Sequence, residues 1–196
     1  MQFWFEFAST YSYPAAMRIE AAAARHGVAL DWRPFWLGPI FAEQGWNDSP
    51  FNLQPAKGRY MWRDLERRCA GYGLPLLRPS RFPRNGRLAA RIVIGAAGEP
   101  WLPAFVRAVY HANFAEDRNI TDRGVIVDLL EGLGLPSAAL LASGESERAK
   151  EALAAQTAQA QRLGVFGAPS FIVGDELFWG DDRLEDALDW HVRHAA

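Results

Sequence analysis

Residues 5–16 read FEFASTYSYPAA, and this stretch decides the fold. The aromatic run at residues 3–7 predicts a short buried strand. An alanine-rich segment follows a small polar turn. Pro14 is tolerated only in the first turn of a helix, so a helix should begin within a residue or two of Ser12. Ser9 and Ser12 occupy the positions in which a Cys-x-x-Cys pair would indicate a redox site. The turn therefore combines a helix start with hydroxyls in place of sulfurs.

The segment downstream completes a strand–helix–strand unit. The helix is expected at residues 13–26, because Gly27 is a typical residue just past a helix C-terminus. Residues 29–33 alternate between apolar and polar side chains, which predicts a second strand. Together the three elements form a βαβ unit.

The central part of the chain has a different character. Residues 34–58 are rich in Pro and Gly, and we expect them to be irregular. The chain that follows predicts a series of helices separated by Pro and Gly breaks, at residues 59–72, 88–97, 101–114, 122–133, 136–142 and 146–163.

Strand character returns near the C-terminus. Residues 170–173 and 177–179 flank the tripeptide Gly174-Asp175-Glu176, which predicts a hairpin. A last helix is expected at residues 182–192. The chain thus ends in two strands and a helix, after a long helical segment.

This order of elements predicts an α/β fold with a helical insertion. Residues 1–38 and 164–196 are expected to share one mixed sheet, as a discontinuous domain. Residues 39–163 are expected to form an inserted all-helical domain that also carries the active-site loop.

Composition argues against several broad classes of protein. The chain has 196 residues and a formal net charge of −2, and no basic block predicts a nucleic-acid partner. No apolar segment is long enough to cross a bilayer, and the first residues read as a strand rather than a signal peptide, so we expect a cytoplasmic location. Cys69 is the only cysteine, which excludes an internal disulfide and favours a buried structural thiol. No grouping of residues predicts a metal site.

The two serines of the turn do not form a recognisable hydrolase site. A serine hydroxyl is a weak nucleophile unless a base lies beside it, and no histidine of this chain stands in a triad motif. A helix N-terminus, however, lowers the pKa of a thiol placed against it, and the Ser9 hydroxyl could donate a hydrogen bond to the thiolate. The sulfur would have to arrive on a ligand. The alternative is that Ser9 and Ser12 only cap the helix.

Short motifs along almost the whole chain point to one family. They are Ser9-Thr10-Tyr11-Ser12-Tyr13, Pro55-Ala56-Lys57-Gly58-Arg59-Tyr60, Phe82-Pro83-Arg84-Asn85, Phe166-Gly167-Ala168-Pro169 and Trp179-Gly180-Asp181-Asp182-Arg183. With these motifs the chain resembles the thioredoxin-like fold with a helical insertion. Within that fold it resembles the 2-hydroxychromene-2-carboxylate isomerase and kappa-class glutathione transferase family. Thr10 stands where the family's opening motif usually has proline.

The resemblance implies a glutathione site. Ser9 is expected to face the glutathione sulfur as the catalytic residue. Ala168, which precedes an expected cis-proline at Pro169, should offer its backbone N–H and C=O to the peptide. The charged ends of glutathione are expected at Asp181, Asp182, Arg183 and Lys57. Three of these also have ordinary alternatives, since either aspartate could cap the last helix and the lysine could be solvated.

The resemblance also implies where substrate binds. The candidate substrate-binding residues are polar and lie in the irregular stretch or the Phe82 motif: Asn47, Asn52, Arg84 and Asn85. The choice between Asn47 and Asn52 stays open. Trp36, Trp46 and Phe82 could wall an aromatic pocket, although core packing explains any single one of them.

Three functions are compatible with these residues. The first is a glutathione-dependent isomerase of a small aromatic compound, in which a thiolate adds reversibly, a bond rotates and glutathione is regenerated. The second is a transferase that leaves glutathione on an electrophilic product. The third is a non-catalytic thioredoxin-like protein that keeps a peptide-binding groove. The resemblance further implies a homodimer.

Overall fold

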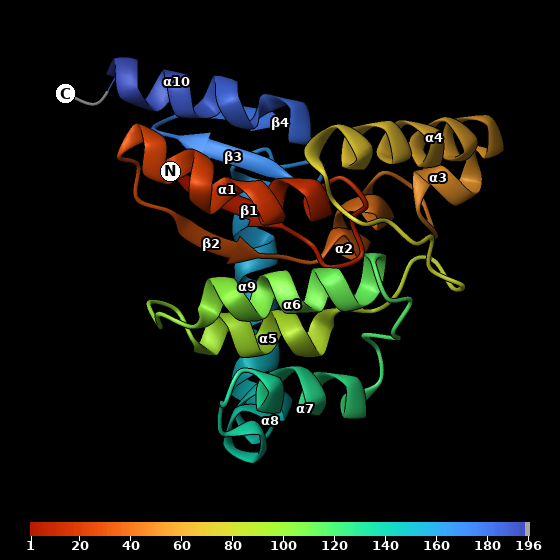
Figure 1. The fold of residues 1–196 in the computed structure, drawn as a ribbon, viewed down its shortest axis with the longest axis vertical. Coiled ribbons are helices and arrows are strands. Elements are labelled where there is room, and N and C mark those ends of the chain that lie inside the picture. Colours follow the sequence, from red (N-terminus) through yellow and green to blue (C-terminus); the bar gives the residue numbers. More distant parts are fainter. Residues whose placement is uncertain (195–196) are drawn as a thin grey trace.

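The sheet that the sequence predicts is present. In the computed structural model, which describes residues 1–194, the strands are ordered β2-β1-β3-β4 in one four-stranded sheet (Figure 1). β1 (Gln2–Phe5) pairs in parallel with β2 (Asp31–Pro34) and antiparallel with β3 (Ser170–Val173). β4 (Glu176–Trp179) pairs antiparallel with β3. The prediction of a mixed sheet built from the two ends of the chain is confirmed.

One face of the sheet is covered by α1 (Ser12–His26) and α10 (Leu184–His194). β1 sends Phe3 and Phe5 to this face, where both join the main hydrophobic core. Because neighbouring residues of a strand point to opposite faces, Trp4 lies on the other side. The nearly unbroken aromatic run of β1 is therefore explained by burial on both faces.

The opposite face is covered by α2 (Leu37–Glu43) and α9 (Glu147–Arg162). A second, smaller core forms there, which contains Trp4, Phe35, Leu37, Ile40, Ala160, Val165 and Ile172. In Figure 1, α9 passes behind the sheet and continues into the lower group of helices. This helix therefore joins the sheet to the helical insertion.

The chain between β2 and β3 is helical, as predicted. Besides α2 and α9 it forms α3 (Pro50–Leu53), α4 (Pro55–Tyr72), α5 (Arg87–Gly95), α6 (Leu102–Phe114), α7 (Arg123–Gly132) and α8 (Ser137–Glu145). α6 packs against α1, whereas α5, α8 and α9 pack on one another (Figure 1). Cys69 of α4 is buried, as predicted, and burial raises the pKa of its thiol to about 11.

The prediction that residues 34–58 are irregular is wrong in part. This segment contains α2, α3 and the first turn of α4, and α2 crosses the expected domain boundary at residue 38. Pro39 is the third residue of α2, while Pro50 and Pro55 are the first residues of α3 and α4. In the first turn of a helix a missing N–H is not needed, so these prolines mark helix starts.

The elements that matter for function meet at one end of the sheet. There β1 leads into α1, and the chain enters β3 opposite Trp4. Across residues 1–194, no helix is both long and apolar enough to cross a membrane. Over the same range, the His, Cys, Asp and Glu side chains form no group of three or more that could hold a metal ion.

Candidate functional site

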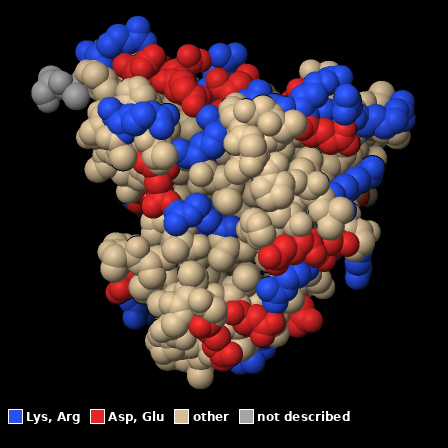
Figure 2. Space-filling view, in the orientation of Figure 1, with Lys and Arg blue, Asp and Glu red and all other residues tan. Residues whose placement is uncertain are grey.

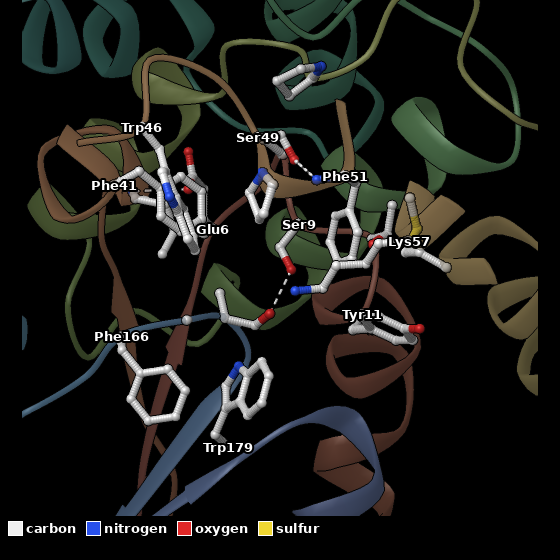
Figure 3. Close-up of a pocket in the computed structure, with 18 of the residues that line it drawn as sticks. Glu6, Ser9, Tyr11, Phe41, Trp46, Ser49, Phe51, Lys57, Phe166 and Trp179 are labelled. Atoms are coloured by element: carbon white, nitrogen blue, oxygen red, sulfur yellow. Dashed lines mark hydrogen bonds between the residues drawn. The ribbon is translucent and has the colours of Figure 1, made fainter. Parts of the chain in front are cut away.

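A cavity of about 1030 Å³ opens at this end of the sheet, beside the start of α1 (Figure 3). Its walls come from the turn after β1, from α2, α3 and α4, from the loop before β3, and from the segment between β4 and α10. The predicted site residues that line it are Ser9, Asn47, Lys57, Ala168, Asp181, Asp182 and Arg183. The fold therefore brings together segments that lie far apart in the sequence.

Ser9 has two hydrogen bonds that link the helix start to the loop before β3. Its hydroxyl donates to the Ala168 carbonyl oxygen at 2.8 Å, and its Oγ accepts from the backbone N–H of Ser12 at 3.3 Å. Ser9 therefore also has the capping role that was considered as the alternative, because its Oγ accepts the Ser12 N–H at the start of α1. Donation to a ligand sulfur would require only that the hydroxyl hydrogen turn away from Ala168.

The peptide bond between Ala168 and Pro169 is cis, as expected. Ala168 lines the cavity, whereas Pro169 is buried behind it and accepts a hydrogen bond at its carbonyl oxygen from Gly180 N–H at 2.9 Å. A second cis bond, which was not predicted, joins Phe82 and Pro83, and both of these residues also line the cavity.

The Asp181 carboxylate is the centre of a buried ion-pair cluster. It is 1% exposed, and its two oxygens accept from Arg18 at 2.8 Å and from Arg68 at 2.5 Å. The Arg18 guanidinium also lies over the Tyr72 ring, 3.8 Å from its centre. Both oxygens of this carboxylate are therefore taken by arginines of α1 and α4, which leaves the backbone of the segment, rather than the Asp181 side chain, to face a ligand.

The remaining predicted glutathione residues and the predicted substrate residue Asn47 line the cavity with exposed side chains. Asp182 and Arg183 are exposed in the short 3-10 helix η1 (Asp181–Arg183) that precedes α10. Lys57 is exposed in the first turn of α4, and Asn47 is exposed in the loop between α2 and α3. These four side chains remain accessible to a ligand.

Three predicted substrate residues lie outside the cavity lining. Arg84 is buried, forms an ion pair with Asp117, and donates to the Arg118 carbonyl oxygen at 3.0 Å. Asn85 accepts from the backbone N–H of Arg87, and Asn52 donates to Asp48 and to the Phe82 carbonyl oxygen. The structure therefore corrects the expectation for Arg84, Asn52 and Asn85, because their polar groups hold the loop itself.

Aromatic side chains form much of the cavity wall. Trp36, Trp46 and Phe82 line it, as the pocket interpretation expects. Further aromatic residues also line the cavity, although the sequence analysis did not assign them to the pocket wall: Tyr11, Phe41, Phe51, Tyr60, Phe166 and Trp179. Phe166 and Trp179 are about half exposed at the rim, with ring centres 4.9 Å apart (Figure 3). Such a wall suits a flat apolar ligand.

Two ionisable groups of the cavity have strongly raised pKa values. Burial raises the pKa of Glu6 to about 7, against the opposing effects of the backbone hydrogen bond from Leu37 and the charge of Arg87. Burial, and then the hydrogen bond to Asp64 at 2.9 Å, raises the pKa of the Tyr11 phenol well above its usual range. Sequence reasoning missed Glu6, although an acidic residue between Phe5 and Phe7 was a usable signal.

Basic side chains lie along one side of the cavity. Lys57, Arg68 and Arg183 line it, and further basic side chains follow along α4. Figure 2 shows Lys and Arg side chains predominating over this helix, at the upper right of the molecule. Acidic residues line the cavity as well, among them Asp64 and Asp182, and Arg68 is paired with Asp181, so the lining carries charges of both signs.

Thr10 carries a buried hydroxyl that has no hydrogen-bond partner among the described residues. Its side chain is 1% exposed, and within the described part of the chain its Oγ1 accepts or donates no hydrogen bond. We expect Thr10→Val, which keeps the shape and removes the hydroxyl, to raise the free energy of unfolding by about 1 kcal/mol. Urea unfolding measures this change.

A matched control is available in Thr157, which is 3% exposed. Its Oγ1 accepts the backbone N–H of Trp36 at 3.1 Å, so Thr157→Val should instead lower stability by about 1 kcal/mol. Equal losses in the two variants would show that the Thr10 hydroxyl is satisfied.

The chain matches known proteins over nearly its full length. The model of the DSBA-like thioredoxin domain family matches residues 1–189. A relative named 2-hydroxychromene-2-carboxylate isomerase from Sphingobium xenophagum is 32% identical over 94% of both chains. A relative of the same name from Pseudomonas putida is 31% identical over 94% of this chain and 90% of that one.

A solved structure gives the same result in three dimensions. The structure described as selenomethionine 2-hydroxychromene-2-carboxylate isomerase superimposes with a TM-score of 0.88 at 28% identity, covering 99% of this chain and 95% of that chain. Both the sequence and the fold are thus matched from end to end. The chain therefore belongs to the DsbA-like thioredoxin family, and within that family it is an isomerase of the 2-hydroxychromene-2-carboxylate isomerase group.

Proposed function

We propose that this isomerase uses glutathione as its cofactor and acts on 2-hydroxychromene-2-carboxylate or a closely similar aromatic compound. The observation that carries the proposal is the placement of Ser9. Its hydroxyl lies at the start of α1, hydrogen-bonded to the residue before a cis-proline, in a cavity with aromatic walls. The names of the relatives supply the substrate class.

The groups at the start of α1 and before β3 are suited to bind a thiol-containing peptide. The start of α1 carries the positive end of the helix dipole, which favours a thiolate. The Ser9 hydroxyl adds a donor that can turn toward sulfur once it leaves the Ala168 carbonyl. Ala168 can then pair its backbone with the extended peptide, as an added strand does.

Charged residues at the rim suit the two ends of glutathione. Asp182 is exposed and can pair with the ammonium of the γ-glutamyl end. Lys57 lies in the first turn of α4, where the helix dipole disfavours a cation, so its position is better explained by binding a carboxylate. We assign Asn47, rather than Asn52, to substrate binding because only Asn47 lines the cavity.

The chemistry divides between glutathione and the protein. Bound glutathione would supply a thiolate that adds reversibly to the carbon–carbon double bond and leaves after rotation about the resulting single bond. Ser9 and the start of α1 hold the negative charge at sulfur before addition and after departure. The aromatic wall binds the flat ring system and keeps water away from the reacting carbon.

The proposal is tested by following isomerisation of 2-hydroxychromene-2-carboxylate by absorbance, with and without glutathione. We expect turnover that requires glutathione, leaves its concentration unchanged after many turnovers, and is not supported by S-methylglutathione. Loss of glutathione in step with product would instead indicate a transferase. Full turnover without any thiol would contradict the proposed cofactor.

A further inference from the structure

Glu6 places a carboxyl group in the cavity wall. It follows β1 directly, and Figure 3 shows its side chain beside Trp46 and Phe41, facing the same space as Ser9. Its backbone carbonyl oxygen accepts the N–H of Ser9 at 3.0 Å, which fixes the turn that presents both side chains to the cavity. Glu6 is thus part of the same rigid turn as the proposed thiolate-binding residue.

The Glu6 carboxyl is held at one oxygen and open at the other. Oε2 accepts the backbone N–H of Leu37 at 2.9 Å, at the first turn of α2. Within the described residues, Oε1 makes no hydrogen bond. Arg87 and Tyr110 are the charged or titratable groups that act on this carboxyl, and the Arg87 guanidinium lies over the Trp36 ring, 4.7 Å from its centre. Glu6 therefore has no close ion-pair partner.

Two other ionisable groups of the cavity, Asp181 and Tyr11, are already engaged by neighbouring side chains. Asp181 is locked between arginines, and the Tyr11 phenol is held to Asp64 with its pKa raised. Among the described lining residues none is a histidine or a cysteine. A carboxyl whose burial raises its pKa to about 7 gains and loses a proton most readily at that pH.

The proposed substrate class requires such a proton transfer. In a 2-hydroxychromene-2-carboxylate, carbon 2 carries both a hydroxyl group and the ring oxygen. Opening the ring removes the hydroxyl proton, forms a carbonyl at carbon 2, breaks the bond from carbon 2 to the ring oxygen, and leaves a phenolate that takes up a proton. The two oxygens share one carbon, so one carboxylate can serve both.

We propose that Glu6 is the proton carrier of ring opening: its carboxylate takes the proton from the 2-hydroxyl and returns it to the phenolate oxygen. The electron pair of the broken bond stays on the phenolate oxygen until protonation, so the Glu6 carboxylate is regenerated and no other reactant is consumed. Ser9 and glutathione then act on the opened compound. This inference rests on the proposed function and adds a catalytic residue to it.

The Glu6→Gln variant separates proton transfer from structure. The glutamine carbonyl oxygen can still accept the Leu37 N–H, so the start of α2 keeps its hydrogen bond, but the amide cannot carry the proton. Glu6→Asp keeps a carboxyl at shorter reach. Glu99→Gln makes the same chemical change at an exposed residue outside the cavity lining and serves as the matched control.

The test compares two substrates, the cyclic 2-hydroxychromene-2-carboxylate and an open-chain analogue whose phenol oxygen is methylated and cannot close the ring. We expect Glu6→Gln to lower kcat on the cyclic compound about 100-fold. Turnover of the methylated analogue and the glutathione Kd should stay near the wild-type values. Glu6→Asp should recover part of the loss, and Glu99→Gln should behave as wild type.

Two results would overturn the inference. Equal losses on both substrates would show that Glu6 only shapes the cavity, and no loss on the cyclic compound would show that another group moves the proton. Absence of glutathione-dependent turnover of both compounds by the wild-type chain would instead overturn the proposed function, and the inference with it.

Discussion

Ser9→Ala is expected to lower kcat/KM for the proposed glutathione-dependent reaction about 100-fold, because it removes the hydroxyl that we propose donates to the sulfur. The Ser12 N–H holds the Ser9 oxygen in place, so only the hydroxyl hydrogen has to turn from the Ala168 carbonyl toward a thiolate. The positive end of the α1 dipole remains in the variant and should preserve part of the activation. Steady-state kinetics with varied glutathione measures the loss.

Ser146 provides the control for a purely structural serine. Its hydroxyl caps α9 by accepting the Ala149 N–H at 3.2 Å, outside the cavity lining. Ser146→Ala should cost about 1 kcal/mol of stability and leave turnover unchanged. If Ser9→Ala behaved in the same way, Ser9 would be a cap alone, and the non-catalytic interpretation of the turn would gain support.

Asp181→Asn is expected to lower the free energy of unfolding by about 3 kcal/mol. The substitution leaves the guanidinium groups of Arg18 and Arg68 without their shared carboxylate, although their side chains are only 16% and 22% exposed. Removing one member of a buried charge cluster costs more than the cluster contributes, because the remaining charges stay desolvated. Urea unfolding at neutral pH measures the change.

Asp186→Asn is the matched comparison. Asp186 pairs with Arg183 at 2.8 Å, but both side chains are more than half exposed. An exposed pair of this kind contributes under about 1 kcal/mol, so the variant should unfold almost as wild type does. Similar losses in the two aspartate variants would contradict the view that Asp181 ties α1 and α4 to the start of α10.

The local features of the fold were predictable because each depends on neighbouring residues. The aromatic run, the position of Pro14 and the alanine-rich segment were sufficient to place β1 and the start of α1. The hairpin around Gly174 follows from the same kind of signal. The Pro-rich segment was predicted to be irregular because a proline in the first turn of a helix and a proline in a loop cannot be told apart from the local sequence.

Contacts between distant segments were not predictable from one sequence. Arg18 pairs with Asp181, which lies 163 positions away in the sequence, and no local pattern predicts that ion pair. The motif that contains Arg84 suggested a substrate-binding residue. In the structure its guanidinium instead donates to backbone carbonyl oxygens of residues 113 and 118 and pairs with the Asp117 carboxylate. Glu6 was the reverse case: it lies between two aromatic residues of a buried strand end, and nothing in that pattern indicates that its side chain reaches the cavity.

The pKa of the glutathione thiol in the complex tests the central claim most directly. Thiolate absorbance near 240 nm, followed against pH with the chain in excess, reports this value. The free thiol titrates near pH 8.5, and we expect the bound thiol to titrate at least about one unit lower. Ser9→Ala should reverse part of that shift. A bound thiol that titrates where free glutathione does would contradict the account, because the start of α1 would then not stabilise a thiolate.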